Sequence, residues 1–235
     1  MNPEMKSGNP DQFAGFYSGI LQIDYKLTEY CYVEARNWFV GKTCLELGPS
    51  TGYMTRYLVN DFESLTAVEG AAELLEKIPD HPALTKVHSL FQNFCPTEKF
   101  DTIVLNHVLE HIAEPVELLI KIKSWLAPGG RFIVGVPNAR SFHRMAAVKM
   151  GMLDSIYSLN ERDHALGHER VYDMDTLRAH LQKAGFLPLA EKGIFMKFLS
   201  NGQIENWFNP QMIEAFYELG KEFPDNCAEI MIIAE

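Results

Sequence analysis

The sequence predicts an α/β fold in which a doubly wound, mostly parallel sheet is covered by helices on both faces. Short apolar runs alternate with amphipathic segments along most of the chain, which is typical of β-α-β units. Some apolar runs are nearly continuous, such as Thr102–Asn106, and this suits strands that are buried on both faces. With 235 residues and 47% hydrophobic composition, the chain can bury a full core as one domain.

Seven apolar runs are expected to form strands, and four amphipathic segments between them are expected to form helices. The expected strands are Thr43–Leu47, Ser64–Val68, Leu84–His88, Thr102–Asn106, Arg131–Val136, Leu187–Lys197 and Glu229–Ala234. The expected helices are Tyr53–Asn60, Ala71–Ile78, Pro115–Leu126 and Asp175–Ala184. Pro128-Gly129-Gly130 is expected to end one helix and turn into the next strand, and Asp173 to cap another.

Two segments fall outside this alternation within the single domain predicted for residues 1–235. Residues 1–40 are expected to form an N-terminal helical cover, because the stretch from Asp11 to Phe39 is rich in aromatic residues. Residues 138–170 interrupt the pattern with Met, His and charged residues. Insertions at the carboxyl end of such sheets tend to bind substrates, so we expect a substrate or lid segment there.

Charge and composition narrow the classes of partner. The net charge of -10, with no basic run, argues against a nucleic-acid partner. No apolar run of about 18 residues is present, and the N-terminus lacks an apolar signal-peptide core, so no membrane association is expected. The four cysteines are scattered without a C-x-x-C pair, which favours a reducing, cytoplasmic location.

The most informative stretch is Glu46-Leu-Gly48-Pro49-Ser50-Thr-Gly52, between an expected strand and an expected helix. A glycine loop in this position lets a nucleotide-like ligand approach backbone N–H groups. The dinucleotide fingerprint G-x-G-x-x-G is absent, which disfavours a nicotinamide dehydrogenase. Glu69 ends the next strand, about 20 residues further on, where a carboxylate can accept hydrogen bonds from ribose hydroxyls.

These motifs resemble those of class I S-adenosylmethionine-dependent methyltransferases of the small-molecule type, over roughly residues 40–235. Ser50 stands where the family usually has its middle glycine. The resemblance implies a Rossmann-like seven-stranded sheet that ends in an antiparallel C-terminal hairpin, and S-adenosyl-L-methionine as the cofactor. The cofactor-binding residues that it implies are Glu46, Gly48, Pro49, Ser50, Gly52, Glu69, Gly70, Leu90, Phe91, Asn106 and His107.

The stretch Gly167-His168-Glu-Arg170-Val-Tyr172 resembles a segment found in many small-molecule members of this class. A hydroxyl or amine acceptor has to lose a proton, and histidine is the natural base near neutral pH. We therefore expect His168 and His164 to be catalytic, with Arg170 and Tyr172 orienting the acceptor. His143 and Arg144, just after the fifth strand, are expected to line the acceptor pocket.

Three alternatives stay open at this point. His107-Val-Leu-Glu110-His111 matches the H-x-x-E-H signature of zinc peptidases, but that signature requires a helix and a distant third ligand, so no metal is expected. A catalytically silent domain that binds the cofactor as a sensor or scaffold is the second alternative, and the dehydrogenase is the third. We expect methyl transfer to O, N or C of a small-molecule acceptor in secondary metabolism, and allow for a homodimer.

Overall fold

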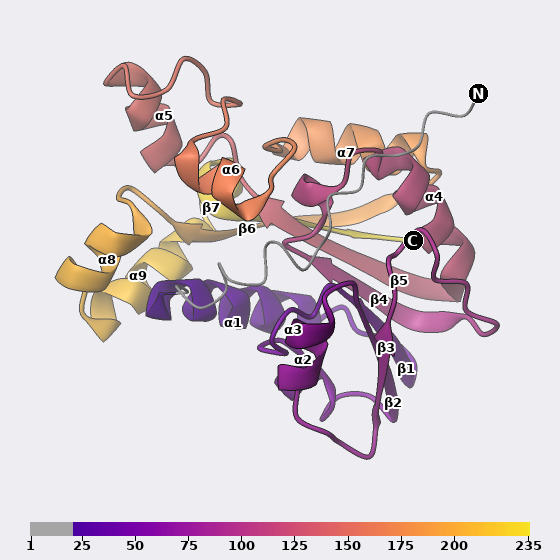
Figure 1. Ribbon diagram of the computed structural model, residues 1–235. Helices are drawn as coiled ribbons and strands as arrows, with labels where there is room; N and C mark the ends of the chain where they lie inside the picture. Colours follow the sequence, from indigo (N-terminus) through magenta and orange to yellow (C-terminus); the bar gives the residue numbers. More distant parts are fainter. Residues whose placement is uncertain (1–20) are drawn as a thin grey trace.

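The computed structural model describes residues 21–235 and contains one seven-stranded mixed sheet with the strand order β3-β2-β1-β4-β5-β7-β6 (Figure 1). The first five strands run parallel, and β7 runs antiparallel to both of its neighbours. The predicted fold class is therefore confirmed, including the antiparallel C-terminal hairpin. The strands are β1 Thr43–Leu47, β2 Ser64–Glu69, β3 Leu84–His88, β4 Phe100–Asn106, β5 Leu126–Pro137, β6 Pro188–Met196 and β7 Cys227–Ala234.

Each face of the sheet carries its own hydrophobic core. Successive residues of β4 alternate between the two cores, with Ile103 and Leu105 in one and Val104 in the other. Helices α4 and α7 cover the first face, and α1 covers the second (Figure 1). This double burial is the reason that the central strands are apolar at nearly every position.

The helices agree with the sequence where capping signals are strong. Asp173 accepts a hydrogen bond from Thr176 N at 2.8 Å and begins α7, as predicted. Gly185, with φ +84°, follows the end of that helix. The helices are α1 Gln22–Arg36, α2 Thr55–Leu58, α3 Ala72–Lys77, α4 Pro115–Trp125, α5 Phe142–Lys149, α6 Glu161–Leu166, α7 Met174–Lys183, α8 Asn201–Trp207 and α9 Pro210–Gly220, with 3₁₀ turns η2 Leu109–His111 and η3 Pro224–Asn226.

Two expectations about local structure were wrong or incomplete. Pro128-Gly129-Gly130 does not precede the fifth strand, because β5 already begins at Leu126 and passes through these residues with a register shift against β4. Helices α5, α6, α8 and α9 were not predicted. For α9 the signal was present, because Asn209 accepts from Met212 N at 2.9 Å and Pro210 occupies the first helical turn.

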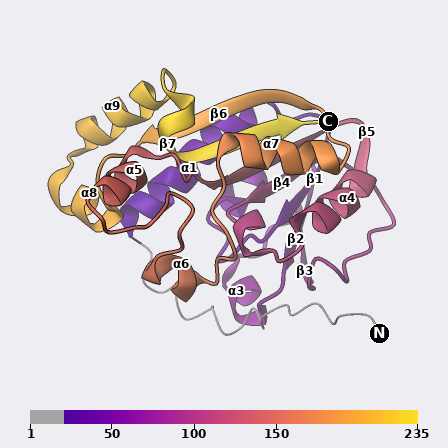
Figure 2. The same ribbon diagram turned by 90° about the horizontal axis from the view of Figure 1, so that it is seen from above.

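The N-terminal cover is helical from Gln22 to Arg36, and the aromatic residues Phe13, Phe16 and Tyr17 lie outside the described residues. Helix α1 packs against β6, β7 and α8, and Tyr30 stacks on Tyr217 with ring centroids 3.8 Å apart. In Figure 1 and Figure 2, α5 and α6 lie at the side of the molecule where α8 lies, away from α4. Among the described helices, none combines the length and apolar character that crossing a bilayer requires.

Candidate active site

Two cavities meet at the carboxyl ends of β1 and β4. The loop-side cavity has a volume of about 820 Å³ and lies between the glycine loop, the turn after β2 and the loop after β3. The helix-side cavity, of about 650 Å³, is bordered by α1, α5, α6 and the ends of β6 and β7. Six residues line both cavities, namely Gly48, Ser50, His107, His111, Leu166 and His168.

The glycine loop turns through three residues with positive φ: Gly48 at +71°, Ser50 at +53° and Gly52 at +81°. A Cβ atom at Gly48 would lie 2.4 Å from Val108 Cγ2, so only glycine fits there. Gly52 packs against Ile78 and lines neither cavity. Ser50 adopts a left-handed conformation that L-residues disfavour, at the position where the family that the sequence resembles usually has glycine.

Glu46 lies under this loop at the end of β1 and is buried. Its Oε2 accepts a hydrogen bond from Thr55 Oγ1 at 2.6 Å. Burial raises the pKa of Glu46 to about 7, against the effect of the Thr55 hydrogen bond, and the nearby Glu69 raises it further. Glu46 therefore acts mainly as a buried anchor between the loop and α2, at the wall of the helix-side cavity.

Glu69 faces the loop-side cavity from the end of β2. Its two carboxylate oxygens accept hydrogen bonds from Ser50 N and Ala71 N, both at 3.0 Å. Burial raises the pKa of Glu69, although these backbone hydrogen bonds lower it. Gly70, Leu90 and Phe91 line the same cavity, so the structure gathers these sequence-predicted residues around Glu69.

The end of β4 forms the wall between the cavities. His107 has φ +55°, and its Nδ1 lies 3.6 Å from Glu110 Oε1 while its Nε2 lies 3.5 Å from Glu229 Oε2. Burial lowers the pKa of His107, but Glu229, Cys31 and Glu110 outweigh it and hold the pKa well above its usual value. Asn106 lines the helix-side cavity, and its buried Oδ1 has no hydrogen-bond partner in the part of the chain that the structure describes.

Lys197 and His143 are neighbours in the wall of the helix-side cavity, where His143 N donates to Lys197 O at 3.0 Å. Burial lowers the pKa of Lys197 to about 8, although Glu229 and Asp24 favour its charged form. Burial also lowers the pKa of His143 to about 3, with Lys197 and Arg144 adding to the effect. His143 is therefore neutral at physiological pH and lines the cavity as an uncharged ring.

His168 lies at the junction of the two cavities, with 9% of its side chain exposed. Its Nδ1 lies 3.3 Å from Asp163 Oδ1, which leaves Nε2 available to the cavities. A carboxylate on Nδ1 fixes the tautomer and the ring orientation. His164 is exposed and lines only the loop-side cavity.

Comparison with known proteins identifies the family to which this chain belongs. Residues 28–191 match the family model described as a methyltransferase domain. The chain belongs to the methyltransferase domain family. A malonyl-[acyl-carrier protein] O-methyltransferase of Halalkalibacterium halodurans is 26% identical over 129 residues, which cover 48% of each chain. The mitochondrial ubiquinone biosynthesis O-methyltransferase of Schizosaccharomyces pombe is 24% identical over 123 residues, 49% of this chain and 45% of that protein.

These sequence matches span about half the length of the curated relatives. Solved structures match nearly the full length of the chain. Because their sequence identity is low, they establish the fold alone. The CcbJ methyltransferase from Streptomyces caelestis has a TM-score of 0.64 at 15% identity, and the match covers 99% of both chains. The N-methyltransferase NodS from Bradyrhizobium japonicum, in complex with S-adenosyl-L-homocysteine, has a TM-score of 0.61 at 14% identity, covering 97% and 98%.

The methyltransferase domain binds S-adenosyl-L-methionine, and the loop-side cavity fits this cofactor. A cavity of this volume is in the range that buries a ligand of nucleotide size. Gly48 leaves open the space that a side chain would fill, and Glu69 lies where ribose hydroxyls can donate to it. Leu90 and Phe91 offer apolar surface for the adenine, and Ser50 and Gly70 border the cavity.

Three substrate residues predicted from sequence have other contacts in the methyltransferase domain. Tyr172 is 1% exposed, contacts His180 Nδ1 through its hydroxyl at 3.1 Å and lines neither cavity, so its predicted role in orienting the acceptor is wrong. Arg170 donates to the backbone oxygens of Ile112 and Ala113. Arg170 and Arg144, the other arginine predicted to bind the substrate, both line the helix-side cavity.

Arg144 is also held by the protein. Its guanidinium donates to Ile156 O at 2.6 Å, to Ser158 O and to Asp163 Oδ2 at 3.2 Å. These contacts fasten the segment that carries α6 to α5, so Arg144 positions the cavity wall. Sequence reasoning missed Glu229, Lys197 and Asp163. For Glu229 a signal existed, because it is the single charged residue within the apolar strand β7.

The zinc-peptidase reading of H-x-x-E-H is wrong in its geometry. His107 follows the last residue of β4, and only Leu109–His111 form a short 3₁₀ turn. The two histidines are therefore not one turn apart on an α-helix, as that signature requires.

Proposed function

We propose that this chain transfers the methyl group of S-adenosyl-L-methionine to a small molecule bound in the helix-side cavity. The observation that carries the proposal is the shared wall between the two cavities. A cofactor in the loop-side cavity and an acceptor in the helix-side cavity would meet at His107, His111 and His168. Such a junction gives the proximity that a direct displacement needs.

The cofactor supplies a methyl group on a positively charged sulfur, which leaves with the electron pair of the broken C–S bond as the acceptor lone pair forms the new bond. The protein therefore needs no nucleophile of its own, and its contribution is to position the acceptor and exclude water. The segment 138–170 supports this role, because it contributes residues from Asn138 to Arg170 to the cavity walls. We propose it as the substrate-binding insertion of a single domain.

Oxygen is the acceptor atom that we propose, because both curated relatives described above carry the name O-methyltransferase. A hydroxyl has to lose its proton, and His168 and His164 are the sequence-predicted bases. His164 lines only the loop-side cavity, and this position gives less support to a role as the base for an acceptor in the helix-side cavity. His168 lines both cavities, and its Nε2 is available. We therefore propose His168 as the group that takes the proton of the acceptor.

The test is calorimetric titration of the purified protein with S-adenosyl-L-methionine, followed by release of S-adenosyl-L-homocysteine in the presence of hydroxylated acceptors. Glu69→Gln should weaken cofactor binding by about 10- to 100-fold, because it removes a charge-assisted hydrogen bond worth about 1.5–3 kcal/mol. Glu73→Gln is the matched control, since Glu73 is an exposed glutamate on α3 close by. Absence of cofactor binding by the folded protein would contradict the proposal.

Turnover separates the enzyme from the second candidate, a silent cofactor-binding sensor. Ser50, in place of the usual glycine, favours that candidate, and so does Leu90, because many members of the family that the sequence resembles have an acidic residue at or near this position. Tight cofactor binding with no methylated product from any acceptor would support the sensor. A cytoplasmic location, a role in secondary metabolism and a homodimer stay predictions, and light scattering tests the last.

A further inference from the structure

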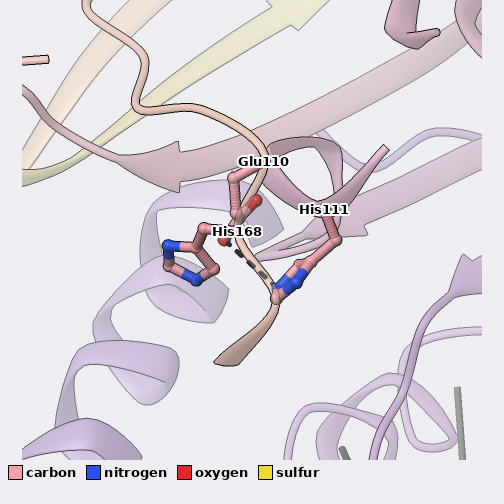
Figure 3. Close-up of side chains that lie close together, drawn as sticks. All are labelled: Glu110, His111 and His168. Atoms are coloured by element: carbon pink, nitrogen blue, oxygen red, sulfur yellow. Dashed lines mark ion pairs between the residues drawn. The ribbon is translucent and has the colours of Figure 1, made fainter. Parts of the chain in front are cut away.

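Glu110, His111 and His168 converge where the two cavities meet (Figure 3). One ligand atom of each residue lies within 4.8 Å of the others. Glu110 Oε1 lies 4.0 Å from His111 Nε2, and the rings of His111 and His168 meet edge to face with centroids 4.7 Å apart. Two imidazoles and one carboxylate form a donor set that divalent first-row metals prefer.

The carboxylate of Glu110 is buried beside the imidazole of His107 without a hydrogen bond of its own. The side chain is 1% exposed, and neither of its oxygens has a hydrogen-bond partner among residues 21–235. The nearest group on its other side is His107 Nδ1 at 3.6 Å, which is beyond hydrogen-bond reach. A buried carboxylate without hydrogen bonds is costly, and a bound cation is one arrangement that satisfies it.

His168 is already oriented as metal-binding histidines usually are. Its Nδ1 faces Asp163 Oδ1 at 3.3 Å, so Nε2 carries the free lone pair. A carboxylate on the second ring nitrogen is the common outer contact of a metal-bound imidazole. Asp163 is itself fixed by Arg144 at 3.2 Å and by Asn160 N at 3.0 Å.

Backbone contacts hold the two parts of the cluster together across 58 residues of sequence. Glu169 N donates to Glu110 O at 2.9 Å, next to His168. Arg170 donates to Ala113 O at 2.9 Å and also to Ile112 O. The loop that carries His168 is thereby fastened to the turn that carries Glu110 and His111. This also gives Arg170 a defined task, which is to position the loop.

We propose that Glu110, His111 and His168 bind a divalent transition-metal ion, and that its open coordination position receives the hydroxyl oxygen of the methyl acceptor. This replaces the expectation of a metal-free site. A tetrahedral ion with bonds of about 2.1 Å holds its donors about 3.4 Å apart, so the three side chains need to close by about 1 Å. Both histidines line both cavities, which directs the open position to their junction.

The second half of the proposal rests on the proposed methyl transfer. An oxygen bound to a divalent ion loses its proton to solvent more readily. The oxygen lone pair then forms the bond to the methyl carbon, and the electron pair of the C–S bond stays on sulfur. With the ion bound, His168 acts as its ligand and solvent takes the proton, which replaces the role of base proposed above for His168.

The test begins with metal binding alone, measured on protein that has been treated with EDTA. A Cys95→Ser background removes the exposed thiol, which binds metals without specificity. Calorimetric titration with Zn²⁺, and separately with Mn²⁺, should show one site. Glu110→Gln and His168→Ala should each weaken it by at least about 10- to 100-fold. His164→Ala, an exposed neighbour outside the cluster, should leave it unchanged.

Circular dichroism of each variant establishes that it is folded. Co²⁺ gives a visible spectrum that changes when azide occupies an open position, and this probes the proposed vacancy without any acceptor. No binding of any of these ions, or binding unaffected by both ligand variants, would overturn the metal site. Calorimetry with S-adenosyl-L-methionine on the same EDTA-treated protein tests the proposed function separately, because Glu69 and the glycine loop are not ligands of the ion.

Discussion

The two cavities differ in what their walls are made of. At the glycine loop, the backbone shapes the loop-side cavity through the positive φ of Gly48 and Ser50 and the N–H groups that hold Glu69. The helix-side cavity is shaped by side chains such as His143, Arg144 and Lys197, which come from segments far apart in sequence. A cavity wall formed by backbone loses its shape when a substitution adds a Cβ atom. A wall formed by side chains loses its shape when the contacts that hold those side chains are removed. The two sides should therefore respond to different substitutions.

Gly48→Ala is expected to have the largest effect. The new Cβ would combine a left-handed φ of +71° with a 2.4 Å approach to Val108 Cγ2. Strain and overpacking together should cost about 3 kcal/mol of unfolding free energy and abolish measurable cofactor binding. Gly129→Ala is the control, since Gly129 has φ +75° and no atom within 4 Å of the added Cβ. It should cost about 1 kcal/mol in urea denaturation, and an equal loss in both variants would refute the steric argument.

Arg144→Met tests the side-chain wall. It removes buried hydrogen bonds to Ile156 and Ser158 and the pair with Asp163, which should cost about 3 kcal/mol. Cofactor affinity should change by less than about 3-fold (under about 0.7 kcal/mol), because Ile156, Ser158 and Asp163 do not themselves line the loop-side cavity. Arg162→Met, which breaks the exposed pair with Asp24, should cost under about 1 kcal/mol. A large loss of cofactor binding in Arg144→Met would mean that the two sides are not independent.

Glu46 predicts a pH effect on stability. Burial raises the pKa of Glu46 in the folded protein to about 7, above its value of 4.5 in the unfolded chain. The folded state therefore binds this proton more tightly, and the stabilisation is present below pH 4.5 and lost as the pH rises towards 7. The loss should amount to about 2–3 kcal/mol. Glu46→Gln should be more stable than the parent at pH 8 and lose this advantage at pH 5, as measured by urea denaturation. Equal differences at both pH values would contradict it.

Ser50→Gly is expected to have the smallest effect and the opposite sign. Glycine relieves the left-handed strain at φ +53° but makes the unfolded chain more flexible, so the net gain should be about 0.5 kcal/mol. Ser89→Gly, at a residue of the same cavity without positive φ, should lose about 0.5–1 kcal/mol. Thermal unfolding of the Ser50→Gly and Ser89→Gly variants measures both changes in stability. Destabilisation by both variants would show that the Ser50 side chain matters more than its backbone.

The same contrast explains what could be predicted from the sequence. β1, β3 and the caps of α7 follow from local patterns, and the glycine loop with Glu69 lies within 24 residues of chain. Local physics fixes both, because apolar periodicity and the need for glycine at positive φ act over a few residues. The predicted start of β5 was wrong because its first residue, Leu126, pairs with Phe100 before a shift in register, and no local signal in the sequence encodes this pairing.

The acceptor side depends on tertiary contacts, and there the sequence was a weaker guide. Arg144 and Tyr172 are residue types that bind substrates in many sites, but packing gives the first to Asp163 and buries the second in the core. Lys197 and Glu229 enter the cavity only because β6 and β7 lie beside the parallel strands. The Glu110-His111 pair was visible as a motif, but its partner His168 is brought to it by the loop that Arg170 holds.

The position of β7 has a consequence for how the protein is made. This strand is synthesised after all the others, yet it lies between β5 and β6 and hydrogen-bonds to both. Until Cys227–Ala234 leaves the ribosome, β6 has no neighbour in the sheet and the helix-side cavity lacks Glu229. The loop-side cavity, whose lining residues extend no further than Glu169, can form on a nascent chain before this strand is made, whereas the helix-side cavity closes only afterwards. A growing polypeptide can thus complete one of the two cavities before the neighbouring cavity has all of its walls.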